Sequence, residues 1–351
     1  MKYAYLMRLS EKIHNSKNKI RLIYFLKALG CIFITIGKIM KRILRLSIKI
    51  ILILFVLANI ITAFHAYKFT HFYDSDALSV HAPIKKSGWQ KTKEIFFGIN
   101  AYKQKNTVTT DSVFQTVILK TNDGLKLEAW YIPVDSARGT VCLFHGHGGT
   151  KSGVYVESEA FRKMGYNTLL LDFRAHGNSE GNTCTIGYDE SEDVKLAYDF
   201  IKNKGEQHII LWGISMGAAA VSKSISDFDI TPSKVILEMP FGSIVKAGEG
   251  RIKMMHLPPE PLATLLTFWG GVEHGFWAFN MKPTAYVKKI KCPVLLQWGL
   301  NDPRVSREEI DAIYNNIPSA KKLVVYQSCG HESLCKVETE KWKTEVSNFL
   351  K

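Results

Sequence analysis

The residue that most directly suggests chemistry is Ser215, which lies between Gly213 and Gly217 in the segment LWGISMGAA. An apolar run precedes this serine and a run of small residues follows it, so the sequence predicts a strand, a sharp turn and a helix. A serine hydroxyl is a poor nucleophile unless a base removes its proton and a carboxylate orients that base. Because Gly-x-Ser-x-Gly also arises by chance, the pattern needs partners elsewhere in the chain.

Side chains able to do chemistry also close other predicted strands. Ligands of an open parallel sheet bind beyond the carboxyl ends of its strands, which restricts the candidates to residues at those ends. The candidates are His145 to Gly149, Asp172, Ser215, Glu238, Asp302 and His331. After Ser215, the start of the predicted helix would add the backbone N–H of Met216 and a dipole that favours a developing oxyanion.

From about residue 111 the sequence alternates between apolar runs and helical patterns. Residues 112–133 predict a hairpin, because β-forming residues flank the turn signal NDG. Near-continuous apolar runs then alternate with amphipathic segments such as 191–204 and 307–316. This alternation is typical of a mostly parallel sheet with helices on both faces, so we expect one α/β domain over residues 111–351.

Residues 241–281 interrupt this alternation. They contain PPEP and the apolar run ATLLTFWGGVEHGFWAF, between two strands that a single helix would connect. We expect an inserted helical cap over the carboxyl edge of the sheet, where it would cover the substrate. Ordinary packing of an apolar helix is the alternative interpretation.

The chain from about 111 to 351 resembles an α/β-hydrolase of the branch of small esterases and serine-aminopeptidase-like hydrolases. GISMG resembles the nucleophile elbow of that family, and HGHGG over 145–149 resembles its oxyanion loop. DFRAHGNSEG over 172–181 resembles a loop that is frequent in the same branch. The order of serine, acid and histidine along the chain also agrees with the family.

The resemblance implies a role for each candidate. Ser215 would be the nucleophile, His331 the general base and Asp302 the residue that fixes the tautomer of the base. Glu238 is the alternative acid, or a residue that caps a loop or shapes the pocket. The backbone N–H groups of Met216 and His147 would form the oxyanion hole, with Gly146 or Gly148 as alternatives to His147.

The remaining polar residues of these loops are expected to be structural. We expect His145 and His147 to hold their loop by hydrogen bonds rather than to bind a metal, and Asp172 to pair with Arg174. No phosphate loop, dinucleotide fingerprint or metal-binding pattern occurs in the sequence, so no cofactor and no metal is implied.

The first 110 residues lie outside this resemblance. The net charge of +14 is concentrated in residues 1–50, which hold 12 Lys or Arg and a single acid, Glu11. Because the rest of the chain is nearly neutral, a nucleic-acid partner is not expected. The basic segment 1–47 precedes the apolar stretch Ile48 to Tyr67, and about 20 apolar residues are enough to span a bilayer.

We expect residues 48–67 to be an uncleaved transmembrane signal anchor, followed by a helical lead-in over 68–110. The flanking charges predict a cytoplasmic N-terminus and an extracytoplasmic catalytic domain. These flanks are Lys41, Arg42, Arg45 and Lys49 before the stretch, and Asp74 and Asp76 after it. A buried core helix and a cleaved signal peptide are the alternatives. The earlier apolar patch, 20–36, is broken by Lys27 and is a poor span.

The six cysteines show no metal-binding spacing. Cys142 and Cys292 fall in apolar runs, where buried free thiols are expected. Cys329 and Cys335 flank His331 and could pair if the domain is extracytoplasmic.

These features together predict a membrane-anchored serine hydrolase that cleaves carboxylic esters. The apolar insertion and the anchor favour lipid-derived or acyl-bearing esters. A peptidase or amidase of the serine aminopeptidase type is the main alternative, and a catalytically inactive binding protein on the same fold is another. The expected partners are a small ester or acyl substrate and the membrane, and the sequence leaves the oligomeric state open.

Overall fold

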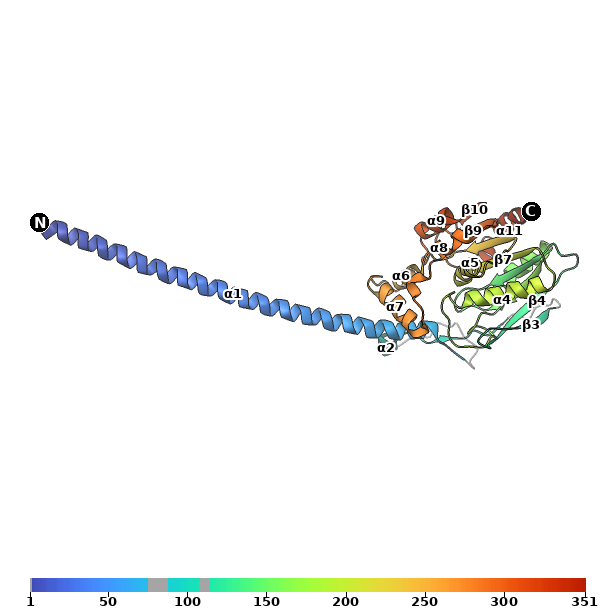
Figure 1. Ribbon diagram of the computed structural model, residues 1–351, viewed down its shortest axis with the longest axis horizontal. Coiled ribbons are helices and arrows are strands. Elements are labelled where there is room, and N and C mark those ends of the chain that lie inside the picture. Colours follow the sequence, from blue (N-terminus) through green and yellow to red (C-terminus); the bar gives the residue numbers. More distant parts are fainter. Residues whose placement is uncertain (1, 75–87, 108–113) are drawn as a thin grey trace. The chain divides into compact units, whose positions relative to one another are not determined.

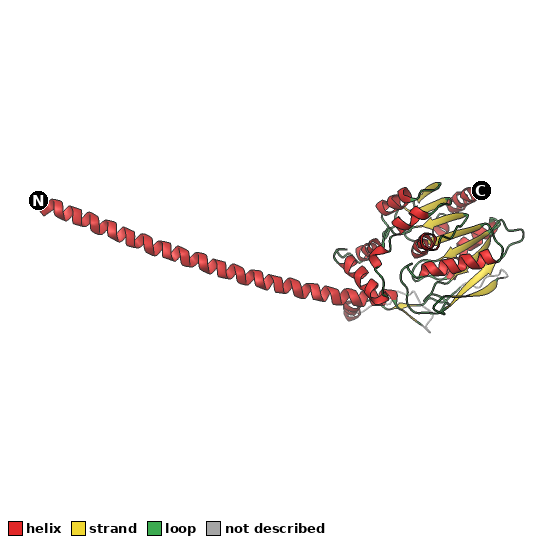
Figure 2. Cartoon of the chain, in the orientation of Figure 1, coloured by secondary structure: helices red, strands yellow, loops and turns green. Residues whose placement is uncertain are grey.

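A computed structural model of the chain describes residues 2–74, 88–107 and 114–351, and it joins the predicted strands in one mixed sheet (Figure 2). The eight strands lie in the order β10-β9-β8-β7-β5-β6-β4-β3. Their bounds are β3 Gln115–Lys120, β4 Lys126–Ile132, β5 Thr140–Phe144, β6 Asn167–Leu171, β7 Ile209–Ile214, β8 Lys234–Glu238, β9 Val294–Gly299 and β10 Lys321–Tyr326.

Only β4 runs against its neighbours in this sheet. It pairs antiparallel with β3 in the predicted hairpin and antiparallel with β6 on its other side, whereas all other pairs are parallel. The strands β5, β7 and β9 are almost completely buried, because helices cover both faces. The prediction of a mostly parallel α/β sheet is therefore confirmed.

Helices cover the sheet in two layers (Figure 1). In one layer α4 (Glu190–Asn203), α5 (Met216–Phe228), α8 (Pro283–Tyr286) and α9 (Arg307–Asn316) pack in succession. In the other, α3 (Tyr155–Lys163), α10 (Leu334–Val337) and α11 (Thr339–Leu350) lie together, with Phe161 against the edge of the buried Trp342 ring. The short 3₁₀ turns are η1 (Lys151–Val154), η2 (Ala278–Asn280) and η3 (Val287–Lys289).

The insertion after β8 forms two helices, α6 (Ile244–Met254) and α7 (Leu262–His274), which pack against each other. Ser243 caps the start of α6, since its side chain accepts a hydrogen bond from the Lys246 amide. Gly275 caps the end of α7 in the left-handed region. Both helices contribute residues to the pocket that contains Ser215.

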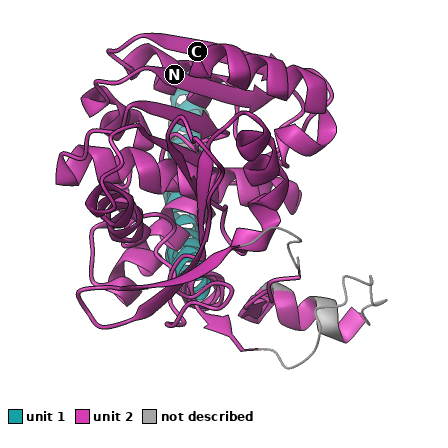
Figure 3. Ribbon diagram, turned by 90° about the vertical axis from the view of Figure 1, so that its right-hand side faces the viewer, with its two compact units in different colours: residues 1–59 teal, residues 60–351 magenta. Residues whose placement is uncertain are grey.

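The N-terminal helix α1 extends from Lys2 to Thr70, so the predicted anchor segment is the later part of a longer helix. By length and composition, α1 is the one helix of the described residues that could cross a membrane. The chain divides into two compact units, residues 1–59 and 60–351 (Figure 3), and the boundary falls within the predicted anchor. Thr62 and Ala66 are 5% and 2% exposed, so one side of the end of that segment is buried in the larger unit.

The residues after α1 remain attached to the larger unit. The Cys184 amide donates to the Thr70 carbonyl at 2.8 Å, and the Phe72 amide donates to the Asn182 carbonyl at 2.7 Å. Strand β1 (Phe72–Tyr73) pairs with β2 (Ala101–Tyr102), and α2 (Gly88–Phe97) lies between them in sequence. The predicted lead-in over 68–110 and the predicted domain start at 111 fall partly outside the described residues.

All six cysteines are free thiols. Cys142 is buried as expected, whereas Cys292 is only partly buried. Cys329 and Cys335 are both buried and unpaired, so the disulfide that the sequence left open does not form in this structure.

Candidate active site

Ser215 occupies a strained turn between β7 and α5. Its φ of 54° and ψ of −114° lie in a region that non-glycine residues rarely adopt. The flanking glycines make the turn possible, because a Cβ on Gly217 would lie 2.2 Å from the Phe144 carbonyl oxygen and one on Gly213 would lie 2.6 Å from the backbone of Gly217. The Gly-x-Ser-x-Gly pattern is thus explained by close backbone approach, which lifts the serine side chain away from the sheet.

The loops after β9 and β10 bring an acid and a histidine to this serine. His331 Nε2 lies 2.9 Å from Ser215 Oγ, and His331 Nδ1 lies 2.7 Å from Asp302 Oδ2. The other carboxylate oxygen of Asp302 accepts the amides of Arg304 at 2.7 Å and Val305 at 3.0 Å. The Asp302 side chain is fully buried, and these hydrogen bonds hold its oxygens in the orientation that binds His331.

Glu238, the alternative acid, points away from His331. Its Oε1 accepts hydrogen bonds from the indoles of Trp212 at 2.9 Å and Trp342 at 2.6 Å, and from the amide of Gln297 at 3.2 Å. Burial, with a smaller contribution from the nearby charge of Glu157, raises the pKa of Glu238 to about 8. Glu238 therefore ties the centre of the sheet to α11, while its backbone carbonyl accepts the Ser215 amide at 2.8 Å.

The loop after β5 lies beside the serine, and two of its amides are already engaged. The Gly148 amide donates to His176 Nε2 at 3.0 Å, and the Gly149 amide donates to the Gly146 carbonyl at 3.0 Å. Within the described part of the chain, the amides of His147 and Met216 have no hydrogen-bond acceptor. Of the alternatives to His147, Gly148 is disfavoured as an oxyanion donor because its N–H is already used.

Two buried histidines link this loop to the loop after β6. His145 Nδ1 donates to the Gly146 carbonyl at 2.7 Å, and its Nε2 accepts the Phe173 amide at 3.2 Å. His176 Nδ1 donates to the Arg174 carbonyl at 2.8 Å, which leaves Nε2 free to accept from Gly148. Burial lowers the pKa of both histidines, so they are neutral and each acts as donor and acceptor at once.

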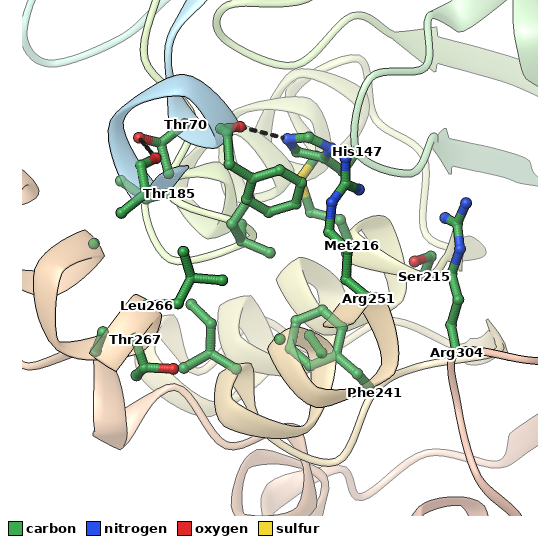
Figure 4. A pocket seen from close by; sticks show the side chains of 18 of the residues that line it. Thr70, His147, Thr185, Ser215, Met216, Phe241, Arg251, Leu266, Thr267 and Arg304 are labelled. Carbon is green, nitrogen blue, oxygen red and sulfur yellow. Dashed lines mark hydrogen bonds between the residues drawn. The ribbon is translucent and has the colours of Figure 1, made fainter. Parts of the chain in front are cut away.

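His147 connects the loop to the N-terminal helix. Its Nε2 donates to the Phe69 carbonyl at 3.0 Å, and its ring stacks on the Phe69 ring with centroids 4.3 Å apart (Figure 4). Burial, assisted by the positive charge of Arg251, lowers the pKa of His147 to about 3. The last turn of α1 therefore contacts the residue that the sequence predicted as an oxyanion donor. The sequence could not predict this contact, because apolar residues at the end of α1 suit a membrane and a protein interior equally well.

The predicted pair between Asp172 and Arg174 is wrong. Arg174 instead binds Asp193 on α4, with Nη2 2.7 Å from Oδ1, and Asp172 binds the buried amine and the amide of Lys151. Both residues follow the end of β6, where the chain no longer continues as a strand, and each side chain reaches a different neighbour in this loop. Asp172 and Arg174 therefore brace the loops around the site through separate partners, not through each other.

A pocket opens at Ser215 and His331, and it is walled mainly by apolar side chains from the insertion and from α1 (Figure 4). The apolar lining consists of Ala66, Phe69, Ile186, Met216, Phe241, Ile244, Ala247, Leu266, Phe276, Ala278 and Val305. Two arginines, Arg251 and Arg304, line it as well, and no Asp or Glu does within the described residues. The sequence analysis identified neither arginine, although Arg304 lies only two residues after Asp302.

One group of side chains near this pocket has the composition of a metal site. His71, Glu273 and His274 offer ligand atoms within 4.8 Å of one another. His71 Nδ1 lies 2.9 Å from the Tyr67 carbonyl oxygen, so a neutral ring that donates there would present Nε2 as the ligand. Imidazole and carboxylate ligands of this kind suit a divalent transition metal. His71 directly follows α1, and Glu273 and His274 are the last two residues of α7, so the group connects the ends of these two helices.

Comparisons with known proteins agree with this architecture. Residues 135–266 match the family described as serine aminopeptidase, S33. A lysophosphatidylserine lipase of Xenopus tropicalis is 26% identical over 65% of this chain, which spans 60% of the length of that lipase. An uncharacterised membrane protein of Saccharomyces cerevisiae is 25% identical over 68% of this chain and 79% of its own. The structure of an esterase of Pyrococcus furiosus is similar with a TM-score of 0.60 and 26% identity, over 72% of this chain and 98% of that one.

Proposed function

We propose that this chain, which has the α/β-hydrolase fold, is a serine hydrolase that cleaves carboxylic esters through Ser215, His331 and Asp302. The observation that carries the proposal is the continuous line of hydrogen bonds from Ser215 Oγ through the His331 ring to Asp302. Similarity to an esterase and to a lysophosphatidylserine lipase supports an ester as the substrate.

In the proposed reaction, Ser215 Oγ attacks the ester carbonyl while His331 Nε2 accepts the hydroxyl proton. Asp302 holds the proton of His331 on Nδ1, so that Nε2 is the basic nitrogen, and stabilises the imidazolium that forms. The amides of Met216 and His147 donate to the oxyanion of the tetrahedral intermediate. His331 then protonates the departing alcohol, and water releases the acid from the acyl-enzyme by the same steps.

A peptidase or amidase is the second candidate, because the matching family is described as a serine aminopeptidase. An aminopeptidase must bind the free ammonium group of its substrate, for which a carboxylate is the natural partner. The charged side chains that line this pocket are Arg251 and Arg304, and none of its described lining residues is acidic. Repulsion between these cations and an ammonium group favours the ester.

A fluorophosphonate probe, which reacts with activated serines, tests the proposal on the full-length protein in a neutral detergent. We expect stoichiometric labelling of the wild type, no labelling of Ser215→Ala, and normal labelling of Ser347→Ala on α11. Hydrolysis of p-nitrophenyl esters should fall at least about 10³-fold in Ser215→Ala. An unlabelled wild type would exclude an activated serine, and faster cleavage of aminoacyl p-nitroanilides than of the esters would favour the peptidase.

We also propose that α1 anchors the protein in a membrane, with a cytoplasmic N-terminus and the catalytic unit on the other side. The apolar composition of α1, the basic residues that precede its most apolar part, and the membrane relative in yeast support this arrangement. Because Thr62, Ala66 and Thr70 are buried in the larger unit, the lipid-facing part of the helix would precede Thr62.

A further inference from the structure

Two arginines of the pocket have no acidic partner among the residues that the structure describes. Arg251 lies on α6 and Arg304 lies two residues after Asp302, and both side chains line the pocket that contains Ser215 (Figure 4). Within the described part of the chain, neither guanidinium has an ion pair or a side-chain hydrogen bond. Arg174 shows how this fold holds a structural arginine, because Asp193 binds it through both carboxylate oxygens.

The two guanidinium groups act on the same small region. Both positive charges help to lower the pKa of His147, which lines the same pocket as Ser215. Burial, followed by the charge of Arg304, lowers the pKa of Arg251 to about 10. Among the described residues, the favourable charge contact of Arg251 is with the Phe69 ring, whose centroid lies 4.2 Å from the guanidinium carbon. Two neighbouring cations without an anion repel each other, and a bound anion would relieve that repulsion.

Most of the remaining pocket lining is apolar and would suit a hydrocarbon chain. Phe241, Leu266 and Phe276 come from the segment after β8 and from α7, and Ala66 and Phe69 come from the end of α1. A ligand that satisfies both parts of the lining carries one apolar chain and one anionic group. The planar guanidinium forks of two arginines match the oxygens of a phosphate better than any neutral headgroup.

We propose that Arg251 and Arg304 form an anion subsite that binds the phosphate of a single-chain ester while its acyl chain occupies the apolar part of the pocket. This inference rests on the proposed ester hydrolysis by Ser215. Ser215 Oγ bonds to the acyl carbon, the ester C–O bond breaks, and the phosphate-bearing alcohol leaves with the proton from His331. Water then cleaves the acyl-enzyme, so the products are a fatty acid and a phosphorylated alcohol, with no change of oxidation state.

A binding experiment tests the subsite without requiring turnover. The full-length protein in neutral detergent is labelled at Ser215 with the fluorophosphonate probe in the presence of dodecyl phosphate or 1-dodecanol, which differ in the phosphate. We expect dodecyl phosphate to slow labelling of the wild type at a concentration about tenfold lower than dodecanol. Arg251→Gln with Arg304→Gln should remove that difference, whereas Arg307→Gln, a control arginine on α9 that pairs with Asp311, should keep it.

Hydrolysis of a matched pair of substrates supplies the second measurement. 1-Lauroylglycerol and 1-lauroylglycerol 3-phosphate share the same ester and differ in the phosphate. We expect kcat/KM of the wild type to favour the phosphate ester about tenfold, mainly through KM, and to lose this preference at high salt. The double glutamine variant should lose more kcat/KM on the phosphate ester than on the neutral ester, so that the preference between the two substrates falls to about one.

The outcomes separate this inference from the proposed function. Equal potency of dodecyl phosphate and dodecanol, or an unchanged preference in the double variant, overturns the anion subsite even if the neutral ester is hydrolysed. An equal loss on both esters, together with a lower melting temperature of the double variant, shows that the arginines are structural. A wild type that is neither labelled nor active on either ester overturns the proposed function itself, and the inference with it.

Discussion

At the scale of single residues, the candidate site is defined by which atoms hold the His331 ring. Asp302 uses one oxygen for His331 Nδ1 and the other for two backbone amides, so the carboxylate cannot turn without breaking three hydrogen bonds. This arrangement fixes the tautomer that presents Nε2 to Ser215.

Replacing this acid by its amide gives the sharpest residue-scale prediction. In Asp302→Asn the side chain still fits, but its amide nitrogen would donate to His331 Nδ1 and leave the histidine proton on Nε2. A protonated Nε2 cannot accept the serine proton. We expect kcat on a p-nitrophenyl ester to fall on the order of 10³- to 10⁴-fold, with KM changed little. Glu332→Gln, beside His331, is the control, and loss of activity below threefold in Asp302→Asn would contradict the assignment.

At the scale of elements, the strands and helices meet around a buried acid that has no part in the proposed reaction. Glu238 at the end of β8 accepts hydrogen bonds from tryptophans of β7 and α11. Its second oxygen has no partner within the described residues. A charge in this position would be poorly solvated, which is why its pKa is raised to about 8 and the carboxyl is protonated at neutral pH.

This raised pKa predicts how stability depends on pH. Between the ordinary pKa of Glu, 4.5, and about 8 the folded state keeps the proton that the unfolded state has lost. The contribution of Glu238 is therefore complete below pH 4.5 and is lost as the pH rises through 8, at up to about 1.4 kcal/mol per pH unit. Glu238→Gln, which does not titrate, should destabilise the protein less, relative to the wild type, at pH 8 than at pH 5.

Thermal unfolding followed by tryptophan fluorescence measures this difference, because Trp212 and Trp342 contact Glu238 directly. Glu340→Gln, an exposed acid on α11, should follow the wild type at every pH. If the melting temperatures of the wild type and Glu238→Gln differ by the same amount from pH 5 to 8, Glu238 does not carry the proton.

At the scale of the whole molecule, α1 combines two roles along one helix. Its last turn, with Ala66 and Phe69, walls the pocket, and Phe69 accepts the hydrogen bond from His147. Its residues before 60 form a separate unit with many exposed apolar side chains. Exposed apolar surface of this extent is typical of a segment that contacts lipid or another protein.

A pair of truncations separates the two roles. A chain that begins at residue 60 should lose membrane association but hydrolyse a soluble short-chain ester within about threefold of the full-length protein, because the pocket wall is intact. A chain that begins at residue 75 should lose at least about tenfold in kcat/KM, since Phe69 and its contacts with His147 are gone. Flotation with vesicles measures association, and persistence of activity in the shorter chain would show that α1 is only an anchor.

Membrane topology is tested on the full-length chain. A reporter that is active only outside the cytoplasm, fused after residue 75, should be active if the basic residues before the anchor stay in the cytoplasm. Activity of a cytoplasmic reporter at the same position would reverse the proposed orientation.

The local pattern of the sequence was sufficient for the fold and for the candidates. Apolar runs bounded by turn residues predict strands, and their alternation with helices predicts parallel pairing, so the residues after β7, β9 and β10 were expected at one edge of the sheet. The glycines around Ser215 could be interpreted from sequence because they reflect a backbone constraint within five residues.

Only the tertiary structure shows which partner each side chain binds when the sequence offers several of the same chemical type. It joined His331 to Asp302 and placed Glu238 among tryptophans, and it paired Arg174 with Asp193 and Asp172 with Lys151. It also brought the end of α1 to the oxyanion loop and left Arg251 and Arg304 facing one pocket without an acid. Charge and hydrophobicity along a chain are local properties, whereas pairing is set by the orientation of strand ends and helix faces that lie far apart in sequence.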